Sequence, residues 1–179
     1  MVFTTEYKEK SGDISMMFEQ TFTASEGPEA GQIIKALVED MFETLDNEDM
    51  HVFSAIEDGV ILGSIIFTRM TYPQDARTVF ILGPVAVSTL FQSKGIGQRL
   101  ITHGLETLRD GGVDMALTYG DVNYYSKVGF SQITEADAQA PLPLQHPEGW
   151  LGQSLTDAQF APLKGPSRCV APLNDPNHW

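Results

Sequence analysis

The sequence is poor in cysteine and in positive charge, and it has no long apolar run. Its 179 residues include one cysteine, Cys169, so no disulfide can form within the chain and nothing requires an oxidising compartment. Lys and Arg number 11 against 24 Asp and Glu, which gives a net charge of −13. Nucleic acids and anionic membranes attract clustered cations, so both are poor partners for this chain.

The longest nearly apolar runs, at 60–67 and 79–87, fall short of the roughly 20 residues that span a bilayer. The beginning of the chain also lacks a basic segment followed by an apolar one, which is the pattern of a secretory signal. We therefore expect a soluble, cytoplasmic protein with no membrane partner.

What the sequence does contain is enough apolar material for one core. Hydrophobic residues make up 42% of the chain, an ordinary globular share. A length of 179 residues favours a single domain over residues 1–179. The acidity is concentrated, because residues 1–60 hold 14 acidic residues and only three lysines. Such a charge excess attracts cationic ligands, although it also fits a plain solvated surface.

Hydrophobic spacing predicts both helices and strands. Apolar residues recur at helical intervals in three segments, and they alternate or run continuously in several others. The expected helices are 14–22, 33–42, 96–108 and a short one at 122–127; the expected strands are 2–7, 52–56, 60–70, 78–87, 115–119, one opening at 129–130, 150–155 and 168–170. Ser11 or Asp13 is expected to cap the first helix. Asp58-Gly59 predicts a hairpin turn, and Gly83-Pro84 predicts a bulge or a splay within the strand 78–87.

The most informative segment lies between this strand and the helix that follows it. It is a glycine-bearing loop, Gln92-Ser93-Lys94-Gly95-Ile96-Gly97, and a helix begins at its end. Unpaired amides and the helix dipole favour a phosphate group at such a place. A simple strand-to-helix turn is the alternative. A P-loop is excluded because the Gly-Lys-Ser/Thr run is absent, and the dinucleotide fingerprint lacks its third glycine.

Two motifs resemble one known family. The run 82–87 followed by the loop 92–97 resembles the acetyl-CoA motif Gln/Arg-x-x-Gly-x-Gly/Ala of the GNAT N-acetyltransferase superfamily. The run 120–130, with its tyrosines and its Gly-Phe ending, is similar to the second signature of that superfamily. The YhbS-like branch of this superfamily is the one that the chain resembles most, through Leu-Gly-Pro-x-Ala-Val at 82–87, residues 141–143 and Trp150. The resemblance covers roughly residues 30–155, with the motif core at 78–130.

This resemblance implies a fold, a cosubstrate and binding residues. The fold is of the α+β class, with a mixed, mostly antiparallel sheet that splays between its fourth and fifth strands and is flanked by helices. Acetyl-CoA is the acyl donor. Its pantetheine arm is expected along the backbone of Val85, Ala86 and Val87. The pyrophosphate is expected on the loop amides from Ser93 to Gln98. The cofactor-binding residues of the loop are Gln92, Ser93, Lys94, Gly95, Ile96, Gly97 and Gln98.

The resemblance also implies catalytic residues. Tyr125 matches the family's general-acid tyrosine, and Asn123 matches a position that contacts CoA. An amine must lose a proton before it attacks, but the strand 78–87 has no ionisable residue to accept it. Asp121 is the candidate base that we select, with Glu26 and Glu29 as alternatives.

The sequence thus predicts an acetyl-CoA-dependent N-acetyltransferase that acts on an amine of a small molecule or protein, as a monomer or homodimer. The acidic N-terminal part favours a cationic acceptor. The alternative functions are a non-enzymatic CoA-binding sensor, which the missing strand base favours, and an ordinary nucleotide-phosphate binder. No metal site is expected, because His51 and His103 have no partner at ligand spacing.

Overall fold

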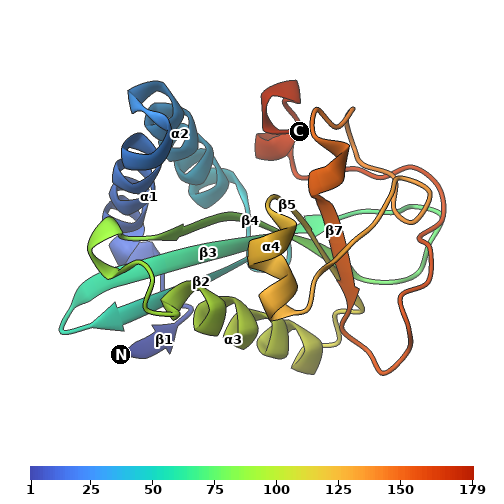
Figure 1. The fold of residues 1–179 in the computed structure, drawn as a ribbon, viewed down its shortest axis with the longest axis horizontal. Coiled ribbons are helices and arrows are strands. Elements are labelled where there is room, and N and C mark those ends of the chain that lie inside the picture. Colours follow the sequence, from blue (N-terminus) through green and yellow to red (C-terminus); the bar gives the residue numbers. More distant parts are fainter. The chain divides into compact units, whose positions relative to one another are not determined.

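The computed structural model describes all residues 1–179 and contains a seven-stranded sheet (Figure 1). The strands are β1 (Val2–Thr4), β2 (Met50–Glu57), β3 (Val60–Met70), β4 (Val79–Val87), β5 (Met115–Tyr119), β6 (Ser131–Gln132) and β7 (Trp150–Ser154), in the order β1-β2-β3-β4-β5-β7-β6. The helices are α1 (Ser11–Glu26), α2 (Pro28–Thr44), α3 (Ile96–Asp110) and α4 (Val122–Tyr125). Strands β4 and β5 are parallel, whereas β1–β2, β5–β7 and β6–β7 are antiparallel. The predicted α+β fold with a mixed sheet is confirmed. No helix combines the length and the apolar character that a membrane crossing needs.

The chain forms two compact units. The first contains residues 1–67 and 84–104, and the second contains residues 68–83 and 105–179. The boundary passes through β3, β4 and α3, and within β4 it falls between Gly83 and Pro84. Each unit therefore holds part of the predicted motif core.

The first unit is built on the helical pair and the strands β1 to β3. Gly27, with φ of 99°, separates α1 from α2, and Pro28 occupies the first helical position. The helices approach so closely that a Cβ on Gly31 would collide with the side chain of Thr23, so only glycine fits there. The predicted cap is wrong: α1 begins after Lys10, and no side chain caps it. A turn at Asp58 and Gly59, both with positive φ, joins β2 to β3 as predicted.

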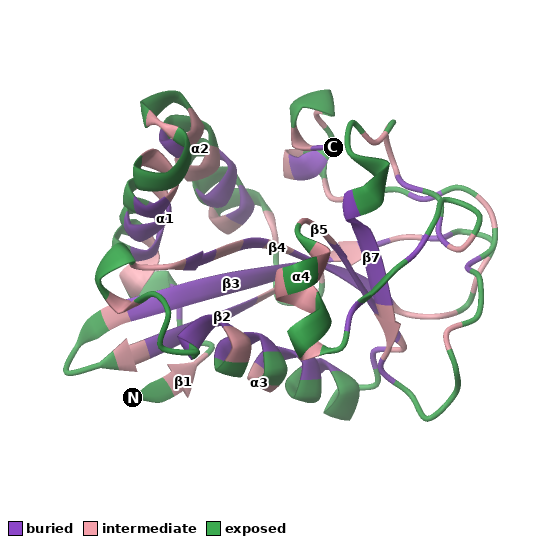
Figure 2. Ribbon diagram, viewed as in Figure 1, coloured by how far each residue is buried: buried purple, intermediate pink, exposed green.

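The second unit is organised around β5 and β7. Val79 to Leu82 of β4 lie opposite Met115 to Thr118 of β5, and the Thr118 hydroxyl donates to the Leu82 carbonyl at 2.9 Å. On the other side of β5, Tyr119 lies directly opposite Trp150 of β7. Strand β7 is buried over most of its length (Figure 2). A bulge or a splay is predicted at 83–84, and the pairing of β4 with β5 ends just before it, at Leu82. Strand β4 itself continues to Val87.

Two of the predicted strand positions need correction. The strand expected at 129–130 begins at Ser131, because Gly129 adopts φ of 95° and closes the turn that follows α4. The strand expected at 168–170 is a single bridge between Thr71 and Arg168. Short segments of this kind carry too little hydrophobic periodicity for their bounds to be predicted.

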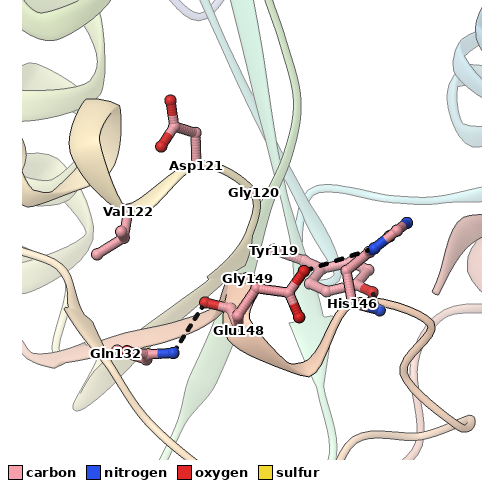
Figure 3. Close-up of a pocket in the computed structure, with 8 residues that line it drawn as sticks. All are labelled: Tyr119, Gly120, Asp121, Val122, Gln132, His146, Glu148 and Gly149. Atoms are coloured by element: carbon pink, nitrogen blue, oxygen red, sulfur yellow. Dashed lines mark hydrogen bonds and ion pairs between the residues drawn. The ribbon is translucent and has the colours of Figure 1, made fainter.

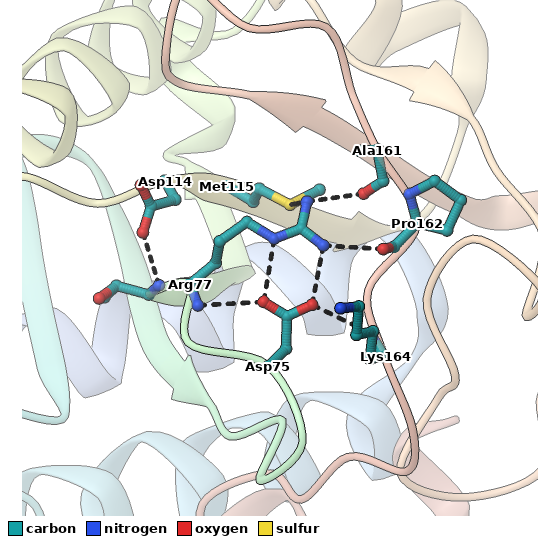
Figure 4. Close-up of polar contacts among 8 residues, drawn as sticks. Asp75, Arg77, Asp114, Met115, Ala161, Pro162 and Lys164 are labelled. Carbon is teal, nitrogen blue, oxygen red and sulfur yellow. Dashed lines mark hydrogen bonds and ion pairs between the residues drawn. The ribbon is translucent and has the colours of Figure 1, made fainter.

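An ion pair fastens the long segment that follows β7. Arg77 donates to both carboxylate oxygens of Asp75, at 3.0 and 2.8 Å, and to the carbonyls of Ala161 and Pro162, both at 2.7 Å (Figure 4). The Lys164 amide donates to the same carboxylate at 3.1 Å. The guanidinium holds the pKa of Asp75 well below its usual range. This cluster fixes residues 161–164, which have no regular secondary structure.

Candidate functional site

The glycine loop of the first unit has the geometry of an anion-binding turn. After the short 3-10 turn Thr89–Phe91, Ser93 and Gly95 adopt φ of 62° and 73°. The Arg99 amide donates to the Gly95 carbonyl at 3.1 Å, which is the first bond of α3. The amides of residues 96–98 thus belong to the first helical turn, where no carbonyl of the helix can pair with them. Since a Cβ on Gly95 would meet no atom within 4 Å, the space beside the loop is open.

The carboxyl end of β4 is attached to this loop. The Gln92 side-chain amide donates to the Val87 carbonyl at 2.9 Å. On β3, a Cβ at Gly63 would lie 2.9 Å from the Ala86 carbonyl oxygen, so glycine permits a close approach of the two backbones. Ala86 is buried, whereas Val85 and Val87 are partly exposed. The first unit therefore holds together all ten of the residues 85–87 and 92–98 that sequence reasoning assigned to CoA.

Tyr125 is held firmly in the second unit. Its ring packs so tightly on Gly120 that a Cβ there would lie 2.8 Å from the ring, and it makes edge contacts with Tyr124 and Phe130. Burial raises the pKa of Tyr125 to about 12, with a smaller contribution from Tyr124, while a hydrogen bond with Thr118 opposes the rise. The phenol therefore stays protonated throughout the neutral range, as a proton donor must.

Asp121 and Asn123 lie at the start of the helix that carries Tyr125. Asp121 is the N-cap of α4, and its Oδ1 accepts the Asn123 amide at 2.9 Å. One carboxylate oxygen of the candidate base is thus occupied by a structural bond. Both side chains are exposed. The alternatives Glu26 and Glu29 are also exposed, at the end of α1 and the start of α2.

A cavity that sequence reasoning missed opens at the carboxyl end of β5. It has a volume of about 570 Å³ and is drawn in Figure 3. Its lining residues are Tyr119, Gly120, Asp121, Val122, Gln132, His146, Glu148 and Gly149. Two carboxylates and one imidazole line it, but no lysine or arginine does. With a neutral imidazole, the lining therefore carries two negative charges and favours a cation.

The loop before β7 supplies the polar side of this cavity. His146 Nδ1 lies 3.6 Å from Glu148 Oε1, and the His146 amide donates to the Tyr119 hydroxyl at 2.6 Å. The Gln132 side-chain amide donates to the Glu148 carbonyl at 3.2 Å. The sequence of this loop is marked only by its prolines, at 141, 143 and 147. They indicate irregular structure but do not predict where any side chain lies. No group of three or more His, Cys, Asp or Glu side chains is arranged to hold a metal ion.

The parallel β4–β5 pair, the glycine loop that opens α3 and the tyrosine-bearing α4 are the elements that carry the two sequence motifs. The chain belongs to the Acetyltransferase (GNAT) family, whose model matches residues 15–130. This confirms the family that the two sequence motifs resembled.

The curated relatives include two proteins of Escherichia coli strain K12. The chain is 38% identical over 120 residues to the "uncharacterized N-acetyltransferase YjhQ" and 24% identical over 112 residues to the "uncharacterized N-acetyltransferase YhbS". These matches cover 64% and 63% of the chain, and 66% and 64% of the relatives, so they span just under two thirds of each relative's length.

Solved structures share the fold over nearly the whole chain. The crystal structure of YhbS from Escherichia coli in complex with CoA has a TM-score of 0.82 at 20% identity and covers 97% of this chain and 92% of its own. A GNAT family acetyltransferase from Brucella melitensis in complex with acetyl-CoA has a TM-score of 0.67 at 24% identity, with 97% of both chains covered. These structures confirm the predicted fold.

Proposed function

We propose that the protein is an acetyl-CoA-dependent N-acetyltransferase whose acceptor is a cationic amine, and that its two units work as one catalytic domain. The observation that carries the proposal is the loop before α3, where Ser93 and Gly95 take positive φ and the amides of residues 96–98 have no helical carbonyl to pair with. Two structural relatives with the same fold hold CoA or acetyl-CoA. The pyrophosphate of acetyl-CoA fits such a loop, and residues 85–87 would hold its pantetheine arm through backbone bonds.

The reaction that we propose is direct attack on the thioester. The amine nitrogen forms a bond to the acetyl carbonyl carbon, the carbon–sulfur bond breaks, and the amide and the CoA thiol are the products. Tyr125 donates its proton to the departing sulfur, and its hydroxyl is suited to this because its raised pKa keeps it protonated. Asp121, or water that it orders, accepts the proton that the ammonium group loses before attack. The second proton, lost from nitrogen as the amide forms, returns to the Tyr125 oxygen through solvent.

The cavity at the end of β5 is the place where we propose that the acceptor binds. Its carboxylates, Asp121 and Glu148, attract an ammonium group, and the Tyr119 ring provides an apolar wall beside them. The candidate acceptors are small polyamines, amino sugars and protein amines, which all carry positive charge at neutral pH.

A panel of amines tests this function. Release of the CoA thiol from acetyl-CoA is measured with cationic diamines, amino sugars and a lysine peptide, and with an uncharged aromatic amine as the matched control. We expect release that depends on the amine and is faster with the cationic members. Equal rates with cationic and uncharged amines would contradict the cationic acceptor.

One observation favours a second function, that of a CoA-binding sensor. Strand β4 carries no ionisable side chain that would serve as a base. The sensor predicts tight CoA binding without thiol release from any amine of the panel, so the same assay separates the two functions.

A further inference from the structure

The segment 171–179 is an ordered part of the second unit. It forms two 3-10 turns, Ala171–Leu173 and Pro176–His178, and Asp175 caps the second by accepting the Asn177 amide at 2.9 Å. Trp179 is only 3% exposed, and its indole N–H donates to the Leu173 carbonyl at 2.9 Å. A buried and hydrogen-bonded indole fixes the segment in one place.

Trp179 completes a cluster of three aromatic rings. Its ring is stacked on Tyr119, with centroids 6.2 Å apart and planes at 19°, and it meets Trp150 edge-on at 6.0 Å and 68°. Tyr119 and Trp150 are register partners on β5 and β7 and contact each other at 6.3 Å. Tyr119 is thus held between a strand neighbour and the segment 171–179.

The cluster continues directly into the loop that lines the acceptor cavity. The Tyr119 hydroxyl accepts the His146 amide at 2.6 Å, and the neighbouring Gln145 side chain donates to the Pro176 carbonyl at 3.0 Å. The loop is therefore fastened at two adjacent residues, once to the tip of Tyr119 and once to the segment itself. Tyr119 and His146 both line the cavity.

We propose that Trp179 is a positioning residue for the acceptor cavity, because it fixes the Tyr119 ring and, through the Tyr119 hydroxyl, the backbone of His146. A tyrosine side chain has two free torsions, and the indole stacked on its ring restricts both. Loss of the indole frees the phenol, and the bond to the His146 amide breaks with it. The role in acetyl transfer rests on the proposed function, whereas the mechanical link between Trp179 and His146 does not.

The test compares Trp179→Ala, Trp179→Phe and Tyr119→Phe. Trp179→Phe keeps a ring on Tyr119, and Tyr119→Phe keeps the cluster but removes the acceptor of the His146 amide. Tyr72→Phe is the matched control, because it also removes a hydroxyl, the one that donates to the Gln139 carbonyl at 2.9 Å, in the same unit but outside the cavity lining. If Trp179→Ala fails to fold, Tyr119→Phe still tests whether the Tyr119 hydroxyl holds the His146 amide.

Hydrogen exchange of the His146 amide is the first readout. We expect exchange about tenfold faster in Trp179→Ala and Tyr119→Phe than in the wild type, and little change in Trp179→Phe and the control. Unchanged exchange in both Trp179→Ala and Tyr119→Phe would overturn the link.

Kinetics are the second readout. We expect the KM for a cationic amine to rise about threefold or more in Trp179→Ala and Tyr119→Phe, with the KM for acetyl-CoA within about twofold of the wild type. Equal changes in both KM values would overturn the positioning role. If the wild type releases no thiol with any amine, the proposed function fails, while the exchange experiment still decides whether Trp179 positions His146.

Discussion

Replacement of Arg77 by Met should destabilise the protein strongly, because it removes one partner of an enclosed ion pair. The Asp75 side chain is 6% exposed and that of Arg77 29% exposed. Without the guanidinium, Asp75 keeps only the backbone amides of Arg77 and Lys164, at 3.0 and 3.1 Å, and two carbonyls of the segment 161–162 lose their donor.

The expected cost follows from that geometry. Removal of one partner of a buried pair costs about 3–5 kcal/mol, and the partial exposure of Arg77 lets water replace some of its bonds, so we expect about 2–4 kcal/mol. For a chain of this size each kcal/mol lowers Tm by about 2–4 °C, which gives a fall of about 5–15 °C. Calorimetry or circular dichroism at neutral pH measures it.

The control and the pH dependence make this prediction refutable. Arg109, exposed in the last turn of α3, is the matched site, and Arg109→Met should change stability by less than about 1 kcal/mol. Since the folded state lowers the pKa of Asp75, the contribution of the pair is present above about pH 4 and is lost as the pH falls further. The difference in Tm between wild type and Arg77→Met should therefore shrink as the pH falls below about 4. Equal Tm losses in the two variants would refute the reasoning.

Four further outcomes are expected. Tyr125→Phe should lower kcat about 100-fold or more while the KM for acetyl-CoA stays within about twofold, because the ring contacts remain; an unchanged kcat in the thiol-release assay would exclude it as the acid. Glu148→Gln should raise the KM for a cationic amine about two- to fivefold, whereas Asp157→Asn, an equal change of charge at an exposed site outside the cavity, should not. Gly95→Ala should weaken acetyl-CoA binding in calorimetry and cost about 1 kcal/mol of stability, because its φ of 73° strains any other residue. Burial raises the pKa of both Tyr125 and Tyr72 to about 12, so the folded state keeps two protons that the unfolded chain loses near pH 10; Tm should fall between about pH 10 and 12, and Tyr72→Phe should reduce that fall.

The segments that could be predicted from sequence are those whose structure is decided by nearby residues. The α2 helix has apolar residues at helical spacing and a proline at its first position, and both features act within a few residues. The glycine loop at 92–97 likewise combines a strand end, a turn and a helix start in one short run. Local propensity and periodicity suffice for such elements.

The cavity could not be predicted, because contacts between distant residues create it. His146 is placed by the hydroxyl of Tyr119, 27 residues earlier in the chain, and Gln145 by a carbonyl 31 residues later. Trp179 joins the same cluster from the far end of the sequence. Periodicity carries no information on such pairs, and the prolines around this loop indicate only that it is irregular.

Asp121 has a structural role besides the catalytic one that we propose. An aspartate that directly precedes a short helix is a common N-cap, and its Oδ1 does accept the Asn123 amide. The sequence alone predicts Asp121 as a base. Its second carboxylate oxygen is free of this bond, so the capping and proton-accepting roles are compatible.

The most direct measurement of acetyl transfer follows both products in one reaction. Acetyl-CoA and a cationic diamine are incubated with the protein, and the CoA thiol and the acetylated amine are quantified by colorimetry and mass spectrometry. We predict that the two appear in equal amounts and that both depend on the protein. Acetyl-CoA that binds the protein but stays intact in the presence of every amine would contradict the account.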